Sequence, residues 1–445
     1  MVRQQAPTRR TAFRAGGNAD SLSLDDAIRL GLAQNASVKV AQLDELRAQQ
    51  RVREARAFRL PEVSAGFSYN RFLQVPKFLF PSFAPDPETG IRVDENNFQV
   101  IDAGLRNAWS LNGLVSVPLI NGGVRNGIRQ AEAGVRVAQA QAGQARQALV
   151  AEIRKAYYQA LIAGEAQSIT EGAIRRAEAT LQEVRQLARL GMATDADTLQ
   201  AYVQLENLRP DLEKARTGVQ TAHLLLKFLI GADYAGTLQL TTRLTMPTPT
   251  APLPDFETAY TEALAKRPDL ALLAQQVEAS RLQIDAAVQA TRPTLALTGQ
   301  YVLSPQANDF NFRRYFWPQQ SFVGLTLSIP IFAGGRHEAR IQQAKLAQQQ
   351  AETQQAQARR QVATEVQHAL AQVQDARRRI QSQLRTIGAA ERSYALVSSR
   401  YQQGMAKRVE LAEADGALRQ AQTNHVQAIY DYLVAVSELE RAVGQ

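Results

Sequence analysis

Two glutamates near the C-terminal end of the chain, Glu410 and Glu413, have the residue type and spacing to bind cations. They follow Gly404 in a segment with helical periodicity, and a spacing of i, i+3 places two side chains on the same face of a helix. Carboxylates held side by side attract cations and repel anions. An ordinary solvated helix face carries such pairs as well, so both interpretations stay open at this point.

Other kinds of chemistry find little support in the residues. The chain has no Cys, which excludes disulfides, thiol nucleophiles and thiolate metal sites. Its four His lie in separate segments without a metal-ligand spacing such as H-E-x-x-H. The Gly-Gly pairs at 122–123 and 334–335 lack the context of a phosphate-binding loop. We therefore expect no catalytic residues, no metal site and no cofactor, and an enzyme is the least favoured class.

The formal net charge of +9 raises the question of nucleic acid. Lys and Arg are scattered along helical stretches rather than clustered with aromatic residues. Solvated helix faces explain the charge better, and we expect no nucleic acid partner.

Hydropathy excludes a membrane-spanning helix, because the sequence has no run of about 18 apolar residues. The alternating strands of a membrane β-barrel escape such a scan and stay possible. The N-terminal stretch lacks the apolar core of a signal peptide, and we expect residues 1–21 to form a flexible segment.

The chain is an internal duplication. "LSLDDAIRLGLAQN" at 22–35 matches the start of "LPDFETAYTEALAKRPDL" at 253–270. Further pairs of residues recur in the same order: Pro61 with Pro293, Pro118 with Pro330, Gly122-Gly123 with Gly334-Gly335, and Gly191-Met192 with Gly404-Met405. We expect a first repeat over 22–235, a linker over 236–252 and a second repeat over 253–443.

Each repeat is predicted to begin with one helix that runs up to its proline, followed by two strands. Apolar and polar residues alternate over 63–70, 109–117, 295–303 and 323–329, within strand regions of about 62–118 and 294–331. Such strands fit a membrane barrel better than a soluble sheet, because no amphipathic segment remains to cover a sheet. Since four strands cannot close a barrel of about eight or more, several chains must share it. The aromatic and Pro-rich segment 72–98 is predicted to be an extracellular loop, either a partial lid or, slightly favoured, a mobile surface loop.

A long helical hairpin is predicted to follow the strands, over 124–230 in the first repeat and over 336–443 in the second. Helix from Arg336 to Gln403 would be roughly 100 Å long. Apolar residues spaced by three and four predict a coiled-coil seam. Its positions are Val362, Val366, Ala369, Val373, Ala376, Ile380, Leu384 and Ile387, then Leu411, Ala414, Leu418, Ala421, His425, Ala428, Tyr432, Ala435 and Leu439.

Three kinds of motif follow one another along the chain: the opening "LSLDDAIRLGLAQN", the strand-to-helix joints "VPLINGG" and "IPIFAGG", and the hairpin tips "RLGMATDADTLQA" and "RYQQGMAKRVELAEA". Together, in this order and duplicated, they resemble the TolC family of outer membrane factors. The resemblance implies a homotrimer in the outer membrane of a Gram-negative cell, in which four strands per chain make a twelve-stranded β-barrel that continues into a periplasmic α-helical barrel. It also implies a passive exit duct for efflux or type I secretion, in contact with outer membrane lipid. A periplasmic adaptor and an inner membrane transporter of the RND, ABC or MFS type would supply cargo and energy.

The resemblance also assigns roles to residues of the hairpin tips. Glu410 and Glu413 would form stacked anionic rings at a periplasmic gate, and Asp197 and Tyr401 would help to hold neighbouring helix pairs closed. The family's basic partner position is Ala406 here, so Lys407 or Arg408 would have to replace it. Gly191, Met192, Gly404 and Met405 would form the tips on which an adaptor docks. The alternative from a different class is a soluble coiled-coil scaffold or adaptor protein without a pore.

Overall fold

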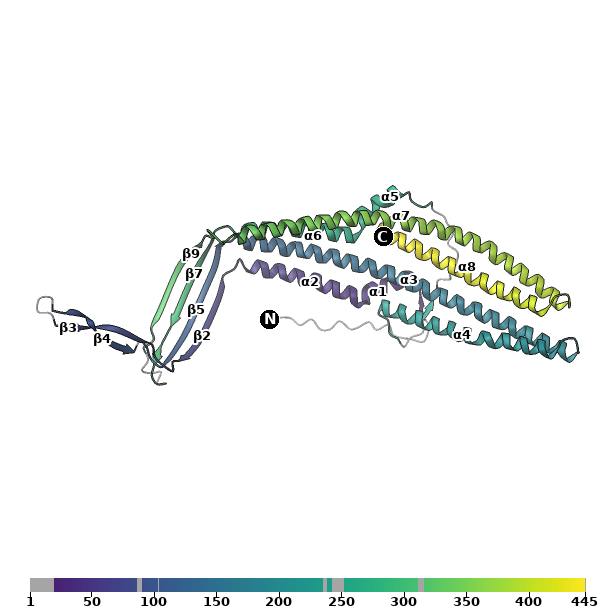
Figure 1. Ribbon diagram of the computed structural model, residues 1–445, viewed down its shortest axis with the longest axis horizontal. Helices are drawn as coiled ribbons and strands as arrows, with labels where there is room; N and C mark the ends of the chain where they lie inside the picture. Colours follow the sequence, from purple (N-terminus) through teal and green to yellow (C-terminus); the bar gives the residue numbers. More distant parts are fainter. Residues whose placement is uncertain are drawn as a thin grey trace. The chain divides into compact units, whose positions relative to one another are not determined.

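The computed structural model describes residues 20–85, 90–102, 104–234, 238–241, 252–310 and 316–444, and in them one order of elements occurs twice (Figure 1). The first series is α1 (Leu24–Gln34), α2 (Ala36–Ala57), β2 (Glu62–Arg71), β5 (Asn107–Ile120), α3 (Gly122–Arg189) and α4 (Asp195–Ile230). The second is α5 (Phe256–Lys266), α6 (Pro268–Gln289), β7 (Thr294–Leu303), β9 (Gln319–Ser328), α7 (Arg336–Gln402) and α8 (Arg408–Val443). The predicted duplication is confirmed.

Contacts divide the chain into two compact units, and both repeats contribute to each. One unit comprises the described residues of 1–47, 136–277 and 350–445, which are mainly helical hairpins. The other comprises the described residues of 48–135 and 278–349, which hold the sheet and the adjoining helices. The repeats in the sequence are therefore not the compact units in space.

The helix before each proline is broken in two, so the prediction of a single helix there is wrong. Between α1 and α2, the buried Asn35 donates from Nδ2 to the carbonyl of Leu229, 2.8 Å away. Between α5 and α6, the buried Arg267 donates from Nη1 to the carbonyl of Ala442 at 3.3 Å. These carbonyls belong to the last turns of α4 and α8, which leave acceptors without intrahelical partners. Each break thus supplies a side-chain donor to the end of a helix that is distant in sequence.

The four long strands form an antiparallel sheet in the order β2-β5-β7-β9, as expected for the four predicted strands. The register places most apolar residues of the four strands on one face; examples are Phe67 opposite Leu111 and Leu297 opposite Leu325. The other face carries Ser, Thr, Asn and Gln together with a few apolar residues. A short strand, β8 (Gln306–Ala307), adds to the start of β5.

Segment 72–98 is not simply a loop. It contains β3 (Lys77–Ala84) and most of β4 (Arg92–Asp102), which pair antiparallel as a separate two-stranded sheet with a register shift between Pro81 and Ser82. The missed signal is a run of Phe and Leu interrupted by Pro81, a residue that strands accept at bulges and edges. Residues 86–89 of this segment lie outside the described residues.

A second small sheet joins segments that were predicted to be a flexible end and a linker. Strand β1 (Asp20–Leu22) pairs in parallel with β6 (Leu238–Leu240). The hydroxyl of the buried Tyr157 donates to the carbonyl of Leu22 at 2.9 Å. Residues 20–21 and 238–240 are therefore structured, while most of the predicted flexible segment and linker lies outside the described residues.

The helical hairpins bury the predicted seam. Val362, Val366, Val373 and Ile380 of α7 pack with Tyr432 and Leu439 of α8 in one apolar core. The seam is shorter than predicted, because Leu384 is 40% exposed. Nearer the turn, Leu411 of α8 lines a pocket with Ala177 and Ala201 of the first hairpin instead.

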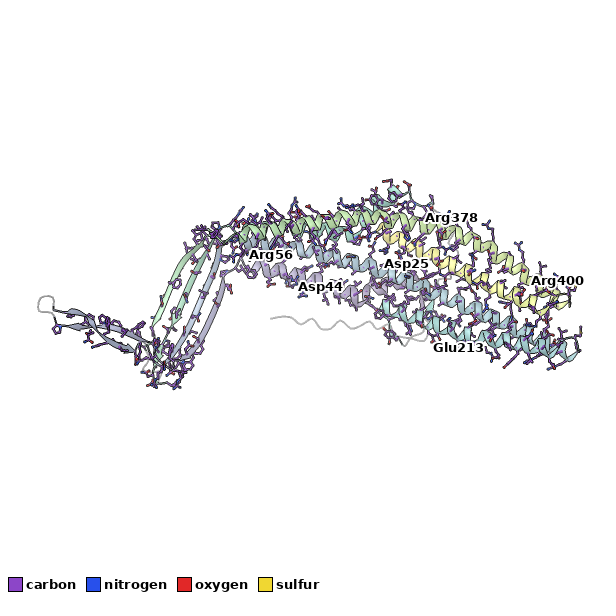
Figure 2. All side chains as sticks on the ribbon, viewed as in Figure 1. Asp25, Asp44, Arg56, Glu213, Arg378 and Arg400 are labelled. Carbon is purple, nitrogen blue, oxygen red and sulfur yellow. The ribbon has the colours of Figure 1, made fainter. Side chains whose placement is uncertain are left out.

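Charged side chains lie on the outside of these helices, as Glu213, Arg378 and Arg400 show (Figure 2). Solvated helix faces therefore account for many of the charges. In the described part of the chain, no helix combines the length and the apolar character needed to cross a membrane.

Candidate functional site: the tips of the helical hairpins

The turns that close the two hairpins have the same backbone structure. Gly191 and Gly404 have φ of +74° and +72°, in the left-handed region. After α3, Gly191 N donates to Ala188 O at 3.0 Å and Met192 N to Leu187 O at 2.8 Å. Gly404 N and Met405 N make the same bonds after α7, to Tyr401 O and Arg400 O. This pair of bonds is the Schellman motif, in which glycine takes a conformation that other residues adopt only with strain.

Acidic residues cap the helices that leave the turns. Asp197 accepts from the backbone N and from Oγ1 of Thr194, at 3.1 and 2.7 Å, in a capping box at the start of α4. Glu410 Oε1 accepts from Lys407 N at 3.3 Å at the start of α8. Glu410 and Glu413 are both exposed. The predicted gate glutamate Glu410 therefore also stabilises its own helix.

The hydrogen bonds from Thr194, supported by the charge of Arg408, hold the pKa of Asp197 below its usual value. Arg408 itself donates from Nη2 to Gln200 Oε1 on α4. A basic residue after Gly404 thus reaches the first hairpin, where its hydrogen-bond acceptor is the amide of Gln200.

Tyr401 lies against the first hairpin. It packs with Ile174 and Ala193 on the apolar cluster that contains Leu181, Val184 and Leu205. Burial raises the pKa of the Tyr401 hydroxyl, with further contributions from the negative charges of Glu183 and Asp197. The structure therefore places the predicted residue at a contact between the two hairpins of one chain.

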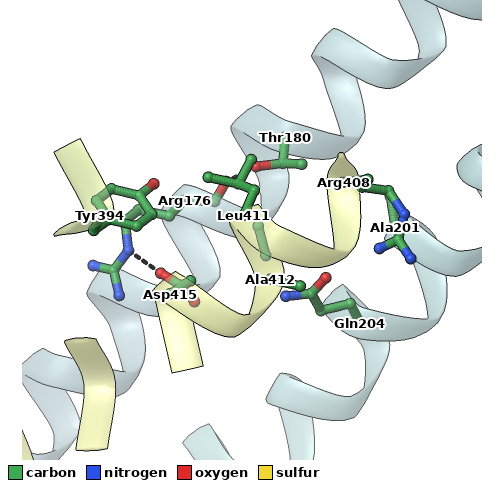
Figure 3. Close-up of a pocket in the computed structure, with 10 residues that line it drawn as sticks. Arg176, Thr180, Ala201, Gln204, Tyr394, Arg408, Leu411, Ala412 and Asp415 are labelled. Atoms are coloured by element: carbon green, nitrogen blue, oxygen red, sulfur yellow. Dashed lines mark hydrogen bonds and ion pairs between the residues drawn. The ribbon is translucent and has the colours of Figure 1, made fainter. Parts of the chain in front are cut away.

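A partly buried ion pair that the sequence did not reveal joins the hairpins a few turns from the tip (Figure 3). Arg176 of α3 and Asp415 of α8 lie 2.5 Å apart, Nε to Oδ1, and only 23% and 13% of their side chains are exposed. The guanidinium carbon of Arg176 lies 5.6 Å from the centre of the Tyr394 ring. Burial and the negative charge of Asp415 raise the pKa of Tyr394. The signal in the sequence was an Asp directly after the seam residue Ala414, which nothing local distinguishes from a solvated Asp.

A small pocket lies beside this pair. Its lining is formed by Arg176, Ala177, Thr180, Ala201, Gln204, Tyr394, Arg408, Leu411, Ala412 and Asp415. A second, more exposed ion pair joins Arg419 of α8 to Asp211 of α4 at 3.3 Å. A further ion pair joins Arg154 of α3 to Glu440 of α8. In the described part of the chain, the two hairpins are thus held together by these three ion pairs and by the packing of Tyr401.

A family model described as "Outer membrane efflux protein" matches residues 27–232 and 259–445, which is most of the chain in two segments. The chain belongs to the outer membrane efflux protein family. Outer membrane protein TolC of Vibrio cholerae is 22% identical over 71% of this chain and 72% of that protein. Outer membrane protein OprJ of Pseudomonas aeruginosa is 27% identical over 72% of this chain, and the aligned part spans 62% of OprJ.

The fold also matches a solved member of this group. The Campylobacter jejuni CmeC outer membrane channel superposes with a TM-score of 0.73 at 18% identity, over 95% of this chain and 85% of the channel. The resemblance to the TolC family is confirmed, and with it the predicted fold class and the outer membrane location. The comparisons support an efflux or secretion duct and give no support to the soluble scaffold.

Proposed function

We propose that three copies of this outer membrane efflux protein assemble into a passive exit duct. The observation that carries the proposal is the open four-stranded sheet. In the described part of the chain, β2 and β9 each pair along one edge only. Unpaired strand edges are not stable in lipid, and an exposed apolar face is not stable in water, so a closed membrane barrel shared by several chains satisfies both. Twelve strands from three chains is the size that the family resemblance implies.

The two faces of the sheet would have different surroundings in this barrel. The apolar face, with Phe67, Leu111, Leu297 and Leu325, would contact outer membrane lipid. The polar face would line the lumen through which cargo passes. The long helices would continue the duct into the periplasm.

The periplasmic end of the duct would be gated by the hairpin tips. Glu410 and Glu413, repeated by a three-fold axis, would form anionic rings that favour cations. Tyr401 packs where the second hairpin meets the first, and the charge of Asp197 acts on the Tyr401 hydroxyl, which supports their predicted part in the closed state. The Arg176–Asp415 pair would hold the two hairpins of each chain together.

The turns at Gly191 and Gly404 would receive the periplasmic adaptor. Met192 and Met405, directly after these glycines, are 73% and 59% exposed, and Met side chains adapt to apolar partner surfaces. An inner membrane transporter would supply the energy and the cargo, whether small molecules for efflux or proteins for type I secretion. The duct itself would have no catalytic residues.

Cross-linking of the strand edges tests the assembly. Because the chain contains no Cys, the double variant Ser64→Cys on β2 and Thr326→Cys on β9 gives one reactive thiol at each edge. A flexible bis-maleimide reagent should produce dimers and trimers and nothing larger. Thr298→Cys on the central strand β7 is the matched control and should stay monomeric in denaturing gels. Monomers alone from the edge variant, in membranes or in detergent, would contradict the proposal.

A further inference from the structure

The polar face of the sheet carries two large apolar side chains at one level. The register aligns Ser64, Leu114, Gln300 and Phe322 in a row across the four strands. Phe322 is 47% exposed and Leu114 is 37% exposed. They lie on the face opposite to the lipid-facing residues, so burial in lipid does not explain them.

The sheet makes room for the phenyl ring. Gly324, two residues further along the same face of β9, has no side chain, and a Cβ built on it would lie 3.9 Å from Phe322 Cδ2. The ring is therefore not shielded by a neighbouring side chain on that side. It stays available to a molecule that passes over the face.

The same face has no charged residue between Glu62 at one end of the sheet and the distal ends of the strands. The row on one side of the apolar level is neutral and holds Gly66, Asn112, Val302 and Gln320. The row on the other side holds Ser116, Thr298 and Gly324, together with Glu62 on the edge strand β2. A single carboxylate on the edge strand acts equally on all solutes of one charge, whereas exposed apolar area attracts apolar groups from water whatever the charge of the solute. Among solutes of equal charge, the wall is thus complementary to those that carry apolar groups.

We propose that Leu114 and Phe322 form an apolar contact level in the lumen, which retains the apolar groups of small organic cargo and so favours its passage over that of hydrophilic solutes of equal charge. The inference rests on the proposed function, because only assembly of the sheet into a duct turns this face into a lumen wall. Three copies would contribute six such side chains. These side chains would select cargo by its apolar groups, whereas the acidic residues of the tips would select it by its charge.

A comparison of two cations of equal charge distinguishes the effect of this apolar level from the effect of the acidic tips. Tetramethylammonium and tetrabutylammonium differ in apolar area but not in charge, so their block of single-channel current in planar bilayers compares apolar contact at constant electrostatics. We expect tetrabutylammonium to block wild-type channels with a longer dwell time. Leu114→Gln/Phe322→Gln should shorten that dwell time about fivefold to tenfold, since a few buried CH₂ groups are lost from the contact, and the block by tetramethylammonium should stay the same.

Two further variants guard against a folding defect. Gln300→Leu adds an apolar side chain to the same row and should lengthen the tetrabutylammonium dwell time. Val323→Ala, on the opposite face of β9, is the control and should have no effect on either cation. If conducting channels show the same dwell times in wild type, Leu114→Gln/Phe322→Gln and Gln300→Leu, the inference is wrong and the duct stands. If well-folded trimers never conduct, both the duct and the inference fall.

Discussion

Arg176 of the first hairpin and Asp415 of the second form an ion pair of 2.5 Å that joins segments 239 residues apart. With Tyr394 beside the guanidinium, the pair is largely removed from solvent. Breaking one partner of such a pair leaves the other charge buried without compensation, which is more costly than losing an exposed pair.

Loss of the charge on Asp415 should loosen the contact between the hairpins. Asp415→Asn should weaken this contact by about 2 kcal/mol and raise the open probability of the channel in planar bilayers. Asp415→Arg combined with Arg176→Asp should restore much of the closed state. Arg419→Ala is the control, because its pair with Asp211 is more exposed and contributes under about 1 kcal/mol. Equal effects of Asp415→Asn and Arg419→Ala would contradict a special role for the buried pair.

The acidic rings are tested best with glutamine. Since Glu410 accepts a hydrogen bond from Lys407 N, alanine at this position would remove a helix cap together with the charge. Glu410→Gln/Glu413→Gln keeps an acceptor oxygen and removes two charges per chain. We expect the reversal potential in a KCl gradient to move toward zero, as cation selectivity falls. Glu206→Gln, on the body of α4, should leave it unchanged, and a double variant as cation-selective as wild type would rule out the rings.

The cluster around Arg267 should make the second repeat sensitive to acid. Arg267 donates to Asp269 at 2.7 and 3.0 Å and to Glu365 at 2.7 Å. Burial opposes ionisation of Asp269, but the hydrogen bonds and charge of Arg267 outweigh it and hold its pKa below the usual value. The stability from this carboxylate is therefore fully present above the unfolded pKa of about 4 and is lost as the pH falls through the lower folded pKa.

Circular dichroism during acid titration measures this effect. Asp269→Asn should lower the thermal midpoint at pH 7 and should flatten its decrease below about pH 4 relative to wild type. Asp255→Asn, at the start of α5 where the side chain makes no capping hydrogen bond, provides the comparison. If the thermal midpoint of Asp269→Asn fell with decreasing pH as steeply as that of wild type, other carboxylates would be responsible for the loss of stability in acid.

The tip glycines should be sensitive to substitution because of their backbone. Gly191→Ala and Gly404→Ala each force a Cβ into the left-handed region, at a cost of about 1–2 kcal/mol. Gly218→Ala is the opposite case, since Gly218 lies inside α4 with open space around it and alanine should stabilise the helix by up to about 1 kcal/mol. Thermal midpoints should move in opposite directions. A midpoint for Gly404→Ala at or above that of wild type would show that the turn tolerates a side chain.

Local periodicity was sufficient to predict the long strands, the long helices and the turns at Gly191 and Gly404. It failed where the cause lies far away in the sequence. Asn35 is a residue type that often caps a helix, and its Oδ1 accepts from Ser37 N at 2.8 Å at the start of α2. The carbonyl of Leu229 that its Nδ2 serves is distant in sequence, and no local pattern indicates it. Strands as short as β1 and β6 have no period to detect, and they depend on each other for pairing.

Part of the candidate site could be predicted from the sequence and part could not. The tip residues could be located by their glycines and by family resemblance. The pairing of Arg176 with Asp415 could not, because it depends on how two hairpins of one chain face each other. The alternation of apolar and polar residues did predict the two faces of the sheet. That Leu114 and Phe322 lie in one row across the strands is known only from the register of all four strands.

Asn35 and Arg267 perform the same task at equivalent places in the two repeats, yet their freedom to change differs. The side chain of Asn35 is neutral and bonds the carbonyl of Leu229 and the neighbouring Ser37, so a single substitution at this junction leaves no charge without a partner. The guanidinium of Arg267 binds Asp269 and Glu365 as well. Replacing Arg267 leaves two carboxylates without their partner, and replacing either carboxylate removes one of the two negative charges that compensate the buried guanidinium. Accepted substitutions at the second junction should therefore occur in concert, whereas those at the first should occur singly.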